Sequence, residues 1–425
     1  MRRFLRTIEP RKITKKVSTR LEAASYLRDG ESILFEKVER YPNFRVAGNL
    51  LTSREVVAAT LDTPKEKLLF KLSGALEAPE AYKITQSANF FKNVFQEPDV
   101  IKHIPLLMYY EREERYYTTA TIIMARDPET GRQNASFHRM MYLERNRFAV
   151  RLVPRDLHDF YLRNRRGGRD TDIVVVCGVH PLLCLAAATS YPGLNELELA
   201  NTLLGGRLTC IQLDGIDVPS DAEVVMTGRI LHDQTAKEGP FVDLTRTWDA
   251  IREQPIIEIE KIYLRDEPIW QVILPGGIEH CLLMGLPQEP RMYKIIQNSV
   301  PSVRNVVLTE GGCYWLHAVV SIEKRVEGEG KNAGLAALAA HPSLKRVIVV
   351  DEDIDILDPE SVEWALATRL QPSRGMVFIP ETRGSSLDPS PGKTGVTTKW
   401  IIDATIPLDR NKSEFAKADV PRTNS

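Results

Sequence analysis

The chain has 425 residues, of which 43% are hydrophobic and 27% are charged, a composition typical of folded proteins with two or three domains. Its 56 basic and 57 acidic side chains leave a net charge of -1, which argues against non-specific binding to nucleic acid or to an anionic membrane surface. The five cysteines share no CxxC spacing. Neither a disulfide framework nor a thiolate zinc site is therefore expected, and we predict a cytoplasmic protein.

The first hundred residues mix helical stretches with short β-branched or aromatic runs, a texture that indicates a small α/β domain. We predict this domain over residues 1–105. Its expected helices are 20–27, 53–61 and 65–76, and its expected strands are 32–35 and 44–47.

The middle of the chain, residues 106–290, reads mainly as strands with a few inserted helices. Residues 173–191 carry no formal charge apart from His180, so hydropathy alone would indicate a membrane span. Gly178-Val179-His180-Pro181 interrupts this stretch, and we interpret it as a buried strand, a turn and a buried helix. The other expected strands are 116–124, 134–142, 147–154, 208–213, 223–231 and 256–264.

Residues 291–425 alternate strands and helices, which predicts a second α/β domain with a partly parallel sheet. A helical pattern over 279–298 leads into this domain. The Gly-, Ser- and Pro-containing stretch 382–398 is expected to be a long loop, and the polar last fifteen residues are expected to be disordered. The predicted elements are strands at 306–308, 315–320 and 347–350 and a helix at 331–340.

Three polar stretches interrupt the middle region where apolar residues are expected: 134–139, 195–198 and 238–243. The first places Arg139 inside a predicted strand, where a buried arginine needs an acidic partner. The third has Gly-Pro between two carboxylates, which forces a bend. Each stretch alone is more typical of a structural ion pair, a helix start or a turn.

Their order along the chain resembles the UbiD family of decarboxylases, which use prenylated FMN. The pattern is Asn-x-x-x-x-Arg at 134–139, Pro-x-x-x-His at 154–158 on the strand expected next, an acid before a helix, and Glu-Gly-Pro-Phe-x-Asp at 238–243. The resemblance implies an N-terminal α/β domain, a split β-barrel over 106–290 that holds the flavin, a linking helix, and a C-terminal α/β domain used in oligomerisation. Further matching segments are 218–223, 349–355, 362–369 and 399–405.

The resemblance also implies a metal and a cofactor site. Asn134, His158 and Glu196 would bind a divalent cation, expected to be manganese, that bridges to the cofactor phosphate, and a potassium ion is expected nearby. One amide oxygen, one imidazole and one carboxylate suit such a cation. The alternative for His158 is a surface histidine beside acidic neighbours. Further cofactor contacts are implied for Phe137, His138, Arg139 and Lys399, the last at the phosphate.

The implied catalytic residues are Arg139, Glu238 and Asp243. Loss of carbon dioxide from an sp² carbon needs an electron sink that no amino-acid side chain supplies, so a cofactor is required. Arg139 would hold the substrate carboxylate through charge-assisted hydrogen bonds, and Glu238 would orient Arg139. Asp243 would protonate the carbon that carbon dioxide leaves.

The sequence therefore predicts a reversible decarboxylase of an α,β-unsaturated or aromatic acid. The substrate expected specifically is trans-anhydromevalonate 5-phosphate, and its decarboxylation would yield isopentenyl phosphate. The cations expected near the substrate phosphate come from the arginine cluster at 163–169 or from Arg151 and Arg155. A 4-hydroxybenzoate-type acid, a non-catalytic flavin-binding subunit of a carboxylase complex, and a plain flavin reductase are the alternatives. The expected partners are a UbiX-type flavin prenyltransferase and further copies of the chain, as a dimer or hexamer.

Overall fold

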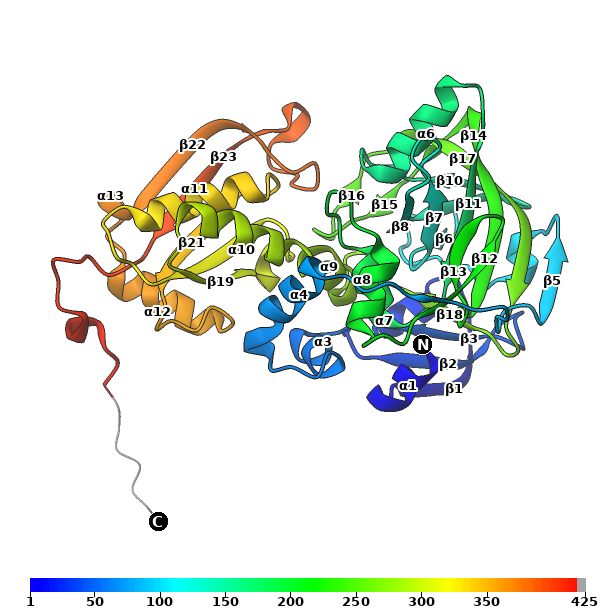
Figure 1. The fold of residues 1–425 in the computed structure, drawn as a ribbon, viewed down its shortest axis with the longest axis horizontal. Helices are drawn as coiled ribbons and strands as arrows, with labels where there is room; N and C mark the ends of the chain where they lie inside the picture. The colour runs from blue at the N-terminus through cyan, green and yellow to red at the C-terminus, as the bar shows by residue number, and fades with distance from the viewer. Residues whose placement is uncertain (419–425) are drawn as a thin grey trace, which may run out of the picture. The chain divides into compact units, whose positions relative to one another are not determined.

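The computed structural model describes residues 1–418, which fold into two compact units (Figure 1). The first unit spans Met1–Pro287, and the second begins at Gln288. Both mix helices and sheets, as the predicted α+β and α/β fold class requires. The division of the first unit at residue 105 stays a prediction.

The N-terminal part of the first unit contains a four-stranded sheet in the order β1-β2-β3-β18. Its last strand comes from late in the chain and pairs in parallel with β3. Ser53 caps α3 by accepting a hydrogen bond from the Val56 N–H, as expected where a helix begins. The elements are α1 (Arg2–Ile8), β1 (Arg11–Val17), α2 (Glu22–Leu27), β2 (Ile33–Val38), β3 (Arg45–Gly48), α3 (Arg54–Thr60), η1 (Lys65–Lys67), α4 (Leu68–Glu77) and β18 (Ile269–Val272).

The centre of the first unit is a nine-stranded sheet with the path β6-β9-β10-β17-β14-β11-β7-β8, to which β5 adds by pairing with β17. The path is open, because β6 and β8 form its two ends, so the strands of the predicted split barrel do not form a closed ring of hydrogen bonds. Its strands are β5 (Asn93–Gln96), β6 (Tyr117–Thr118), β7 (Ile122–Arg126), β8 (Gln133–Phe137), β9 (Met140–Glu144), β10 (Arg147–Val150), β11 (Thr171–Cys177), β14 (Val224–Glu238) and β17 (Arg252–Leu264).

The stretch that resembled a membrane span is β11 followed by α7, as the turn at Gly178–Pro181 predicts. Ile173 to Val176 are at most 2% exposed, because β11 is central in the sheet and packed on both faces. No helix in residues 1–418 has the length and apolar character needed to cross a bilayer. The remaining elements are β4 (Lys83–Ile84), α5 (Val100–His103), α6 (Asp156–Arg166), α7 (Pro181–Ala187), α8 (Glu196–Leu203), β12 (Thr209–Leu213), β13 (Ile216–Pro219), β15 (Phe241–Val242), β16 (Trp248–Asp249) and α9 (Ile278–Gly285).

The second unit contains a five-stranded sheet in the order β19-β20-β21-β23-β22, in which β20, β21 and β23 are parallel. This is the partly parallel sheet that the alternation predicts. Helix α11 lies close against β23, since a Cβ on Gly334 would come within 2.4 Å of Ile401. The elements are α10 (Gln288–Ser299), β19 (Val303–Leu308), η2 (Glu310–Gly312), β20 (His317–Ile322), α11 (Glu329–Ala340), β21 (Arg346–Asp351), α12 (Pro359–Arg369), α13 (Pro372–Gly375), β22 (Met376–Arg383), η3 (Gly392–Thr394), β23 (Val396–Asp403) and η4 (Lys412–Phe415).

Two local expectations are wrong. The loop predicted over 382–398 is shorter, because β22 extends to Arg383 and β23 starts at Val396. The tail contains the turn η4, whose capping box is formed by Asn411 and Glu414, and residues 419–425 lie outside the described part of the chain.

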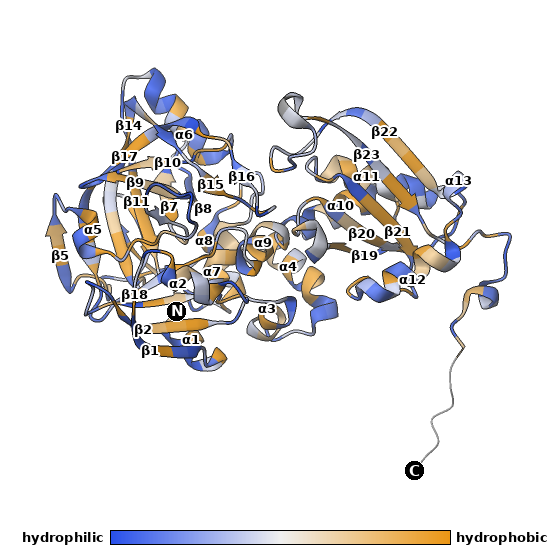
Figure 2. Ribbon diagram, turned by 180° about the vertical axis from the view of Figure 1, so that it is seen from behind, coloured by the Kyte–Doolittle hydropathy of each residue, from blue (hydrophilic) through white to orange (hydrophobic). Residues whose placement is uncertain are grey.

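Hydrophobic residues concentrate on strands such as β2 and β21, whereas the surface helix α6 is mostly hydrophilic (Figure 2).

Candidate active site

Arg139 lies at the corner between two strands. The predicted strand 134–142 is wrong in this respect, because β8 ends at Phe137 and β9 begins at Met140. The pairing partner changes at this corner: β8 pairs with β7, and β9 pairs with β6 and β10. The Arg139 carbonyl still accepts a hydrogen bond from the Arg151 N–H, at 3.2 Å. The Arg139 backbone thus stays hydrogen-bonded to the residue that follows β10.

The guanidinium of Arg139 binds three carboxylates. Glu238 takes two hydrogen bonds, from Nε at 2.9 Å and from Nη2 at 3.0 Å. Asp243 accepts from Nη1 and Asp249 accepts from Nη2, both at 3.0 Å. The Arg139 guanidinium carbon also lies 4.3 Å from the centre of the Phe241 ring. The two predicted acids therefore meet the predicted arginine, together with a third acid that the sequence analysis missed.

The chain path after β14 explains this convergence. Glu238 is the last residue of β14, and the Gly239-Pro240 turn leads into β15. Strand β15 pairs with β16 so that Phe241 lies opposite Asp249. Asp243 follows β15, with its backbone N–H bound to the Thr247 carbonyl at 3.1 Å. In both views β15 and β16 lie beside β8 (Figures 1 and 2).

Burial distinguishes the three acids. The Glu238 side chain is fully buried, that of Asp249 is 6% exposed, and that of Asp243 is 18% exposed. Burial alone would lower the pKa of Arg139, but Glu238 and the two aspartates outweigh it and raise that pKa. Burial alone would raise the pKa of Asp249, but Arg252 and Arg139 outweigh it and lower that pKa. Arg139 and Asp249 are thus firmly charged, and Asp243 is the acid nearest to solvent.

Arg139 has one N–H without a partner in this cluster. A guanidinium carries five N–H groups, one on Nε and two on each Nη. Glu238 and Asp249 use Nε and both N–H groups of Nη2, and Asp243 uses one of Nη1. The free donor is therefore on Nη1, the nitrogen that also binds Asp243. A carboxylate ligand bound there would lie beside Asp243.

Two further side chains adjoin the cluster and were missed because nothing in their local sequence marks them. Tyr117 is 1% exposed, and its hydroxyl has no hydrogen-bond partner in the described part of the chain. Burial is the main cause that raises the pKa of the Tyr117 hydroxyl, and the charge of Glu238 adds to this effect. His280, on α9, accepts a hydrogen bond at Nδ1 from the Gly276 N–H. Burial lowers the pKa of His280, although Asp243 acts in the opposite direction.

A second polar cluster forms on β8 and the start of α8. Asn134 Nδ2 donates to Glu196 Oε1 at 2.9 Å, and the Ala135 N–H donates to Glu196 Oε2 at 3.0 Å. Asn134 Oδ1 is 2.8 Å from the Ser136 hydroxyl. Burial raises the pKa of Glu196 to about 7, and the charge of Asp156 adds to this effect. The structure thus brings together two of the three side chains predicted to bind a metal.

His158 lies on helix α6, so the expectation that it follows on a strand is wrong. Its Nδ1 is buried, has no hydrogen-bond partner within residues 1–418, and lies 3.9 Å from Asp159 Oδ1. Asp156, on the same helix turn, forms an ion pair with Arg132, the residue that precedes β8, so the start of α6 lies near the second cluster. Residues 1–418 contain no group of three His, Cys, Asp or Glu residues arranged for a metal.

The donor chemistry of the second cluster nevertheless fits a divalent cation. Asn134 and Glu196 offer oxygens, and His158 offers an unpaired imidazole nitrogen. A nearby cation would also favour the ionised form of Glu196, whose burial otherwise opposes it. The residues of the chain are thus compatible with the predicted metal, and His158 is the member whose place is least defined by contacts.

The other predicted cofactor residues belong to both units. His138 is buried, with Nδ1 3.0 Å from the Arg151 carbonyl and Nε2 3.0 Å from the Ser136 hydroxyl. Burial lowers the pKa of His138 to about 4, so it is neutral at pH 7. Phe137 is half-buried at the end of β8. Lys399 belongs to the second unit, where its ammonium donates to the Pro342 carbonyl.

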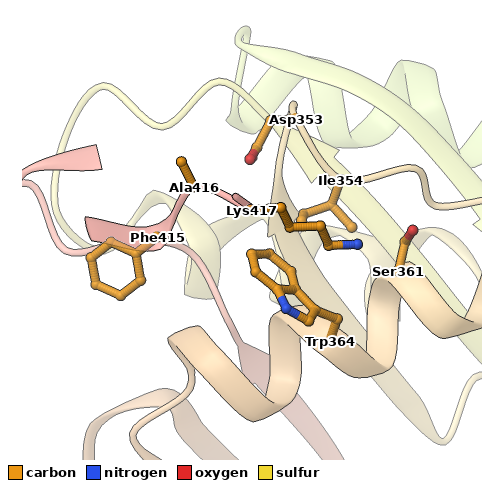
Figure 3. Close-up of a pocket in the computed structure, with 7 residues that line it drawn as sticks. All are labelled: Asp353, Ile354, Ser361, Trp364, Phe415, Ala416 and Lys417. Atoms are coloured by element: carbon orange, nitrogen blue, oxygen red, sulfur yellow. The ribbon is translucent and has the colours of Figure 1, made fainter. Parts of the chain in front are cut away.

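The second unit contains a pocket of about 240 Å³ (Figure 3). Its walls come from the segment after β21, from α12, and from the end of η4 with the residues that follow it. The Lys417 ammonium lies 4.7 Å from the centre of the Trp364 ring. None of the side chains that the sequence singles out for catalysis or cofactor binding lines it. The candidate active site is therefore the Arg139 cluster.

The chain matches three family models. They are described as 3-octaprenyl-4-hydroxybenzoate carboxy-lyase N-terminal domain, Rift-related domain and C-terminal domain, over residues 7–76, 83–278 and 281–404. It is 44% identical to the anhydromevalonate phosphate decarboxylase of Methanothermobacter thermautotrophicus, over 96% of this chain and 97% of that protein. It is 31% identical to the phenolic acid decarboxylase of Bacillus subtilis, over 91% and 86% of the two chains.

The chain also superposes well on solved structures of UbiD-class enzymes. The UbiD-class enzyme HmfF from Pelotomaculum thermopropionicum, in complex with FMN, superposes with a TM-score of 0.96 at 36% identity, over 99% of this chain and 97% of that one. An evolved dimeric form of HmfF with prFMN has a TM-score of 0.90 at 33% identity, over 99% and 96%. The chain belongs to the UbiD family of carboxy-lyases.

Proposed function

We propose that this chain decarboxylates an α,β-unsaturated carboxylic acid with prenylated FMN as cofactor. The observation that carries the proposal is the Arg139 cluster: a buried arginine, oriented by Glu238, keeps one N–H free beside Asp243. A substrate carboxylate bound to that N–H would have the departing carbon dioxide next to the most exposed acid of the cluster. Family membership supports the same chemistry.

The steps assigned to the chain follow from these positions. Arg139 binds the substrate carboxylate through Nη1, and the two hydrogen bonds to Glu238 hold the plane of the guanidinium. The bond to carbon dioxide breaks and leaves its electron pair on the substrate; the flavin, when bound, supplies the electron sink for this pair. Asp243 in its protonated form delivers its proton to the same carbon. Its 18% exposure allows reprotonation from solvent.

The proposed cofactor contacts are those that the sequence implies. Asn134, Glu196 and His158 would hold manganese at the cofactor phosphate, with potassium nearby, and Lys399 would contact the phosphate as a point charge. Phe137, His138 and Arg139 would lie along the flavin. A UbiX-type prenyltransferase would supply the cofactor, and residues 291–425 would form the contacts of a homo-oligomer, a dimer or a hexamer.

The proposed substrate is trans-anhydromevalonate 5-phosphate, with isopentenyl phosphate as product. The similarity to the Methanothermobacter enzyme supports this choice. Arg151 is the cation best suited to a second anionic group. Its guanidinium forms no salt bridge among the described residues, and its one hydrogen bond, to the Leu152 carbonyl, is 3.4 Å long. Burial, followed by the charges of Arg252 and Arg139, lowers its pKa, so an anion would be favoured there.

The arginine cluster at 163–169 is less suited to this role. Arg163 is paired with Asp127 at 2.7 Å, and the other arginines are exposed at the C-terminal end of α6. A phenolic or 4-hydroxybenzoate-type acid is the second candidate, favoured by the similarity to the Bacillus enzyme. A non-catalytic subunit is disfavoured, because Arg139, Glu238 and Asp243 are all present and in contact.

The test is co-expression with a flavin prenyltransferase, anaerobic purification, and mass spectrometry of the released cofactor. A panel of acids, including trans-anhydromevalonate 5-phosphate, 4-hydroxybenzoate and ferulate, is then assayed for carbon dioxide release. We expect prenylated FMN and release from the phosphorylated acid. Plain FMN after full maturation would favour a reductase, and turnover of only aromatic acids would replace the proposed substrate.

A further inference from the structure

Asp249 links the candidate active site to a second arginine. Its Oδ2 accepts from Arg139 Nη2 at 3.0 Å, and its Oδ1 lies 2.7 Å from Arg252 Nη1. Oδ1 also accepts the Ala250 N–H at 2.8 Å. With a side chain only 6% exposed, Asp249 is fixed at both oxygens before any ligand arrives.

This fixed carboxylate limits how an acid can bind to Arg139. A free carboxylate binds a guanidinium most strongly through two parallel hydrogen bonds. The Nε–Nη2 side is occupied by both oxygens of Glu238, and Asp249 occupies the remaining N–H of Nη2. The outer Nη1–Nη2 edge therefore cannot take a second bidentate carboxylate. Only the single N–H of Nη1 remains, beside Asp243.

We propose that Asp249, anchored by Arg252, is a positioning residue that directs the substrate carboxylate to Nη1 of Arg139 and so places the reacting carbon beside Asp243. This inference rests on the proposed function and adds to it a determinant of binding geometry. Asp249 does not touch the substrate. It acts by occupying the donor that would otherwise bind the carboxylate in an unproductive orientation.

The test is the kinetics of Asp249→Asn in the holoenzyme. The amide removes a negative charge and offers Arg139 a weaker acceptor, so a bidentate mode across Nη1 and Nη2 becomes accessible. We expect KM to fall about tenfold, as for a gained hydrogen bond between charged groups, and kcat to fall at least as much because the carbon lies away from Asp243. General damage to the site would instead raise KM.

Further variants serve as controls for Asp249→Asn. Asp249→Glu keeps the charge and should bring KM and kcat back towards their wild-type values. Asp172 is an exposed aspartate on β11, and its replacement by asparagine should change neither KM nor kcat. Arg252→Gln should act in the same direction as Asp249→Asn but more weakly. The double variant should resemble Asp249→Asn, since Arg252 acts through Asp249. Arg252→Gln also serves if Asp249→Asn fails to fold.

A binding measurement separates this inference from the proposed function. Propanoate is titrated into the FMN-loaded protein by calorimetry, which needs no turnover. Tighter binding to Asp249→Asn than to wild type supports the inference even if no acid is decarboxylated, an outcome that would remove the proposed function alone. Unchanged or weaker propanoate binding, or a higher KM at unchanged kcat, overturns the role of Asp249.

Discussion

Replacement of Arg139 by lysine tests whether the guanidinium fork, rather than its charge, organises the site. Arg139 donates four hydrogen bonds to three carboxylates. Lysine keeps the positive charge but has three N–H donors on one nitrogen. At least one contact to a carboxylate is therefore lost, which costs about 1.5–3 kcal/mol in the free energy of unfolding. Alanine would leave Glu238 and Asp249 buried without their shared cation and would cost about 3–5 kcal/mol.

The effect on catalysis should be larger than the effect on stability. All three lysine donors are engaged by the carboxylates of the cluster, so none remains for the substrate. Loss of that interaction should lower kcat/KM by about 100-fold or more, equivalent to about 2.7 kcal/mol of transition-state stabilisation. Unfolding by urea, followed by circular dichroism, and carbon dioxide release give the two quantities for the same preparation.

Arg369→Lys is the matched control. Arg369 is also buried and donates three hydrogen bonds to Asp351 and Asp353, but it belongs to the second unit. A similar loss of stability with unchanged kcat is expected for it. If Arg139→Lys retains more than a tenth of the wild-type kcat/KM, the argument from hydrogen-bond geometry is refuted.

Three other variants test separate parts of the molecule. Asp243→Asn should lose about 100-fold or more in kcat, with stability changed by about 1 kcal/mol, because the amide still accepts from Arg139 but carries no acid proton; retained turnover would exclude the proton role. Glu196→Ala should lower manganese content, measured by plasma mass spectrometry, and flavin content should fall with it; unchanged metal would contradict the bridge. Burial raises the pKa of Glu279 from 4.5 to about 7, so ionising this carboxyl destabilises the folded state. That destabilisation is absent below pH 4.5 and complete above pH 7. Relative to Glu279→Gln, the wild type should therefore lose about 3 kcal/mol of unfolding free energy across that window, and a difference independent of pH would contradict the assignment.

Much of the fold could be predicted from local patterns. The apolar run before Gly178 indicated a buried strand followed by a helix, and both are present. The alternation of strands and helices in the second unit was also predicted correctly. The break between β8 and β9 could not be predicted, because 134–142 is strand-like throughout and the corner arises from a change of pairing partner. The same limit applies to His158, where a helix occupies a stretch expected to be strand.

The sequence by itself determined the chemical identities at the site. The resemblance to the UbiD family, carried by Asn134, Arg139, Glu238 and Asp243, already implies a carboxylate-binding arginine with acidic partners. Only the tertiary structure decided that Asp249 completes the cluster. Its contact with Arg139 joins residues 110 positions apart and depends on the pairing of β15 with β16. Short-range spacing follows from covalent geometry, whereas an ion pair between distant residues exists only where the path of the folded chain brings both charges to one point.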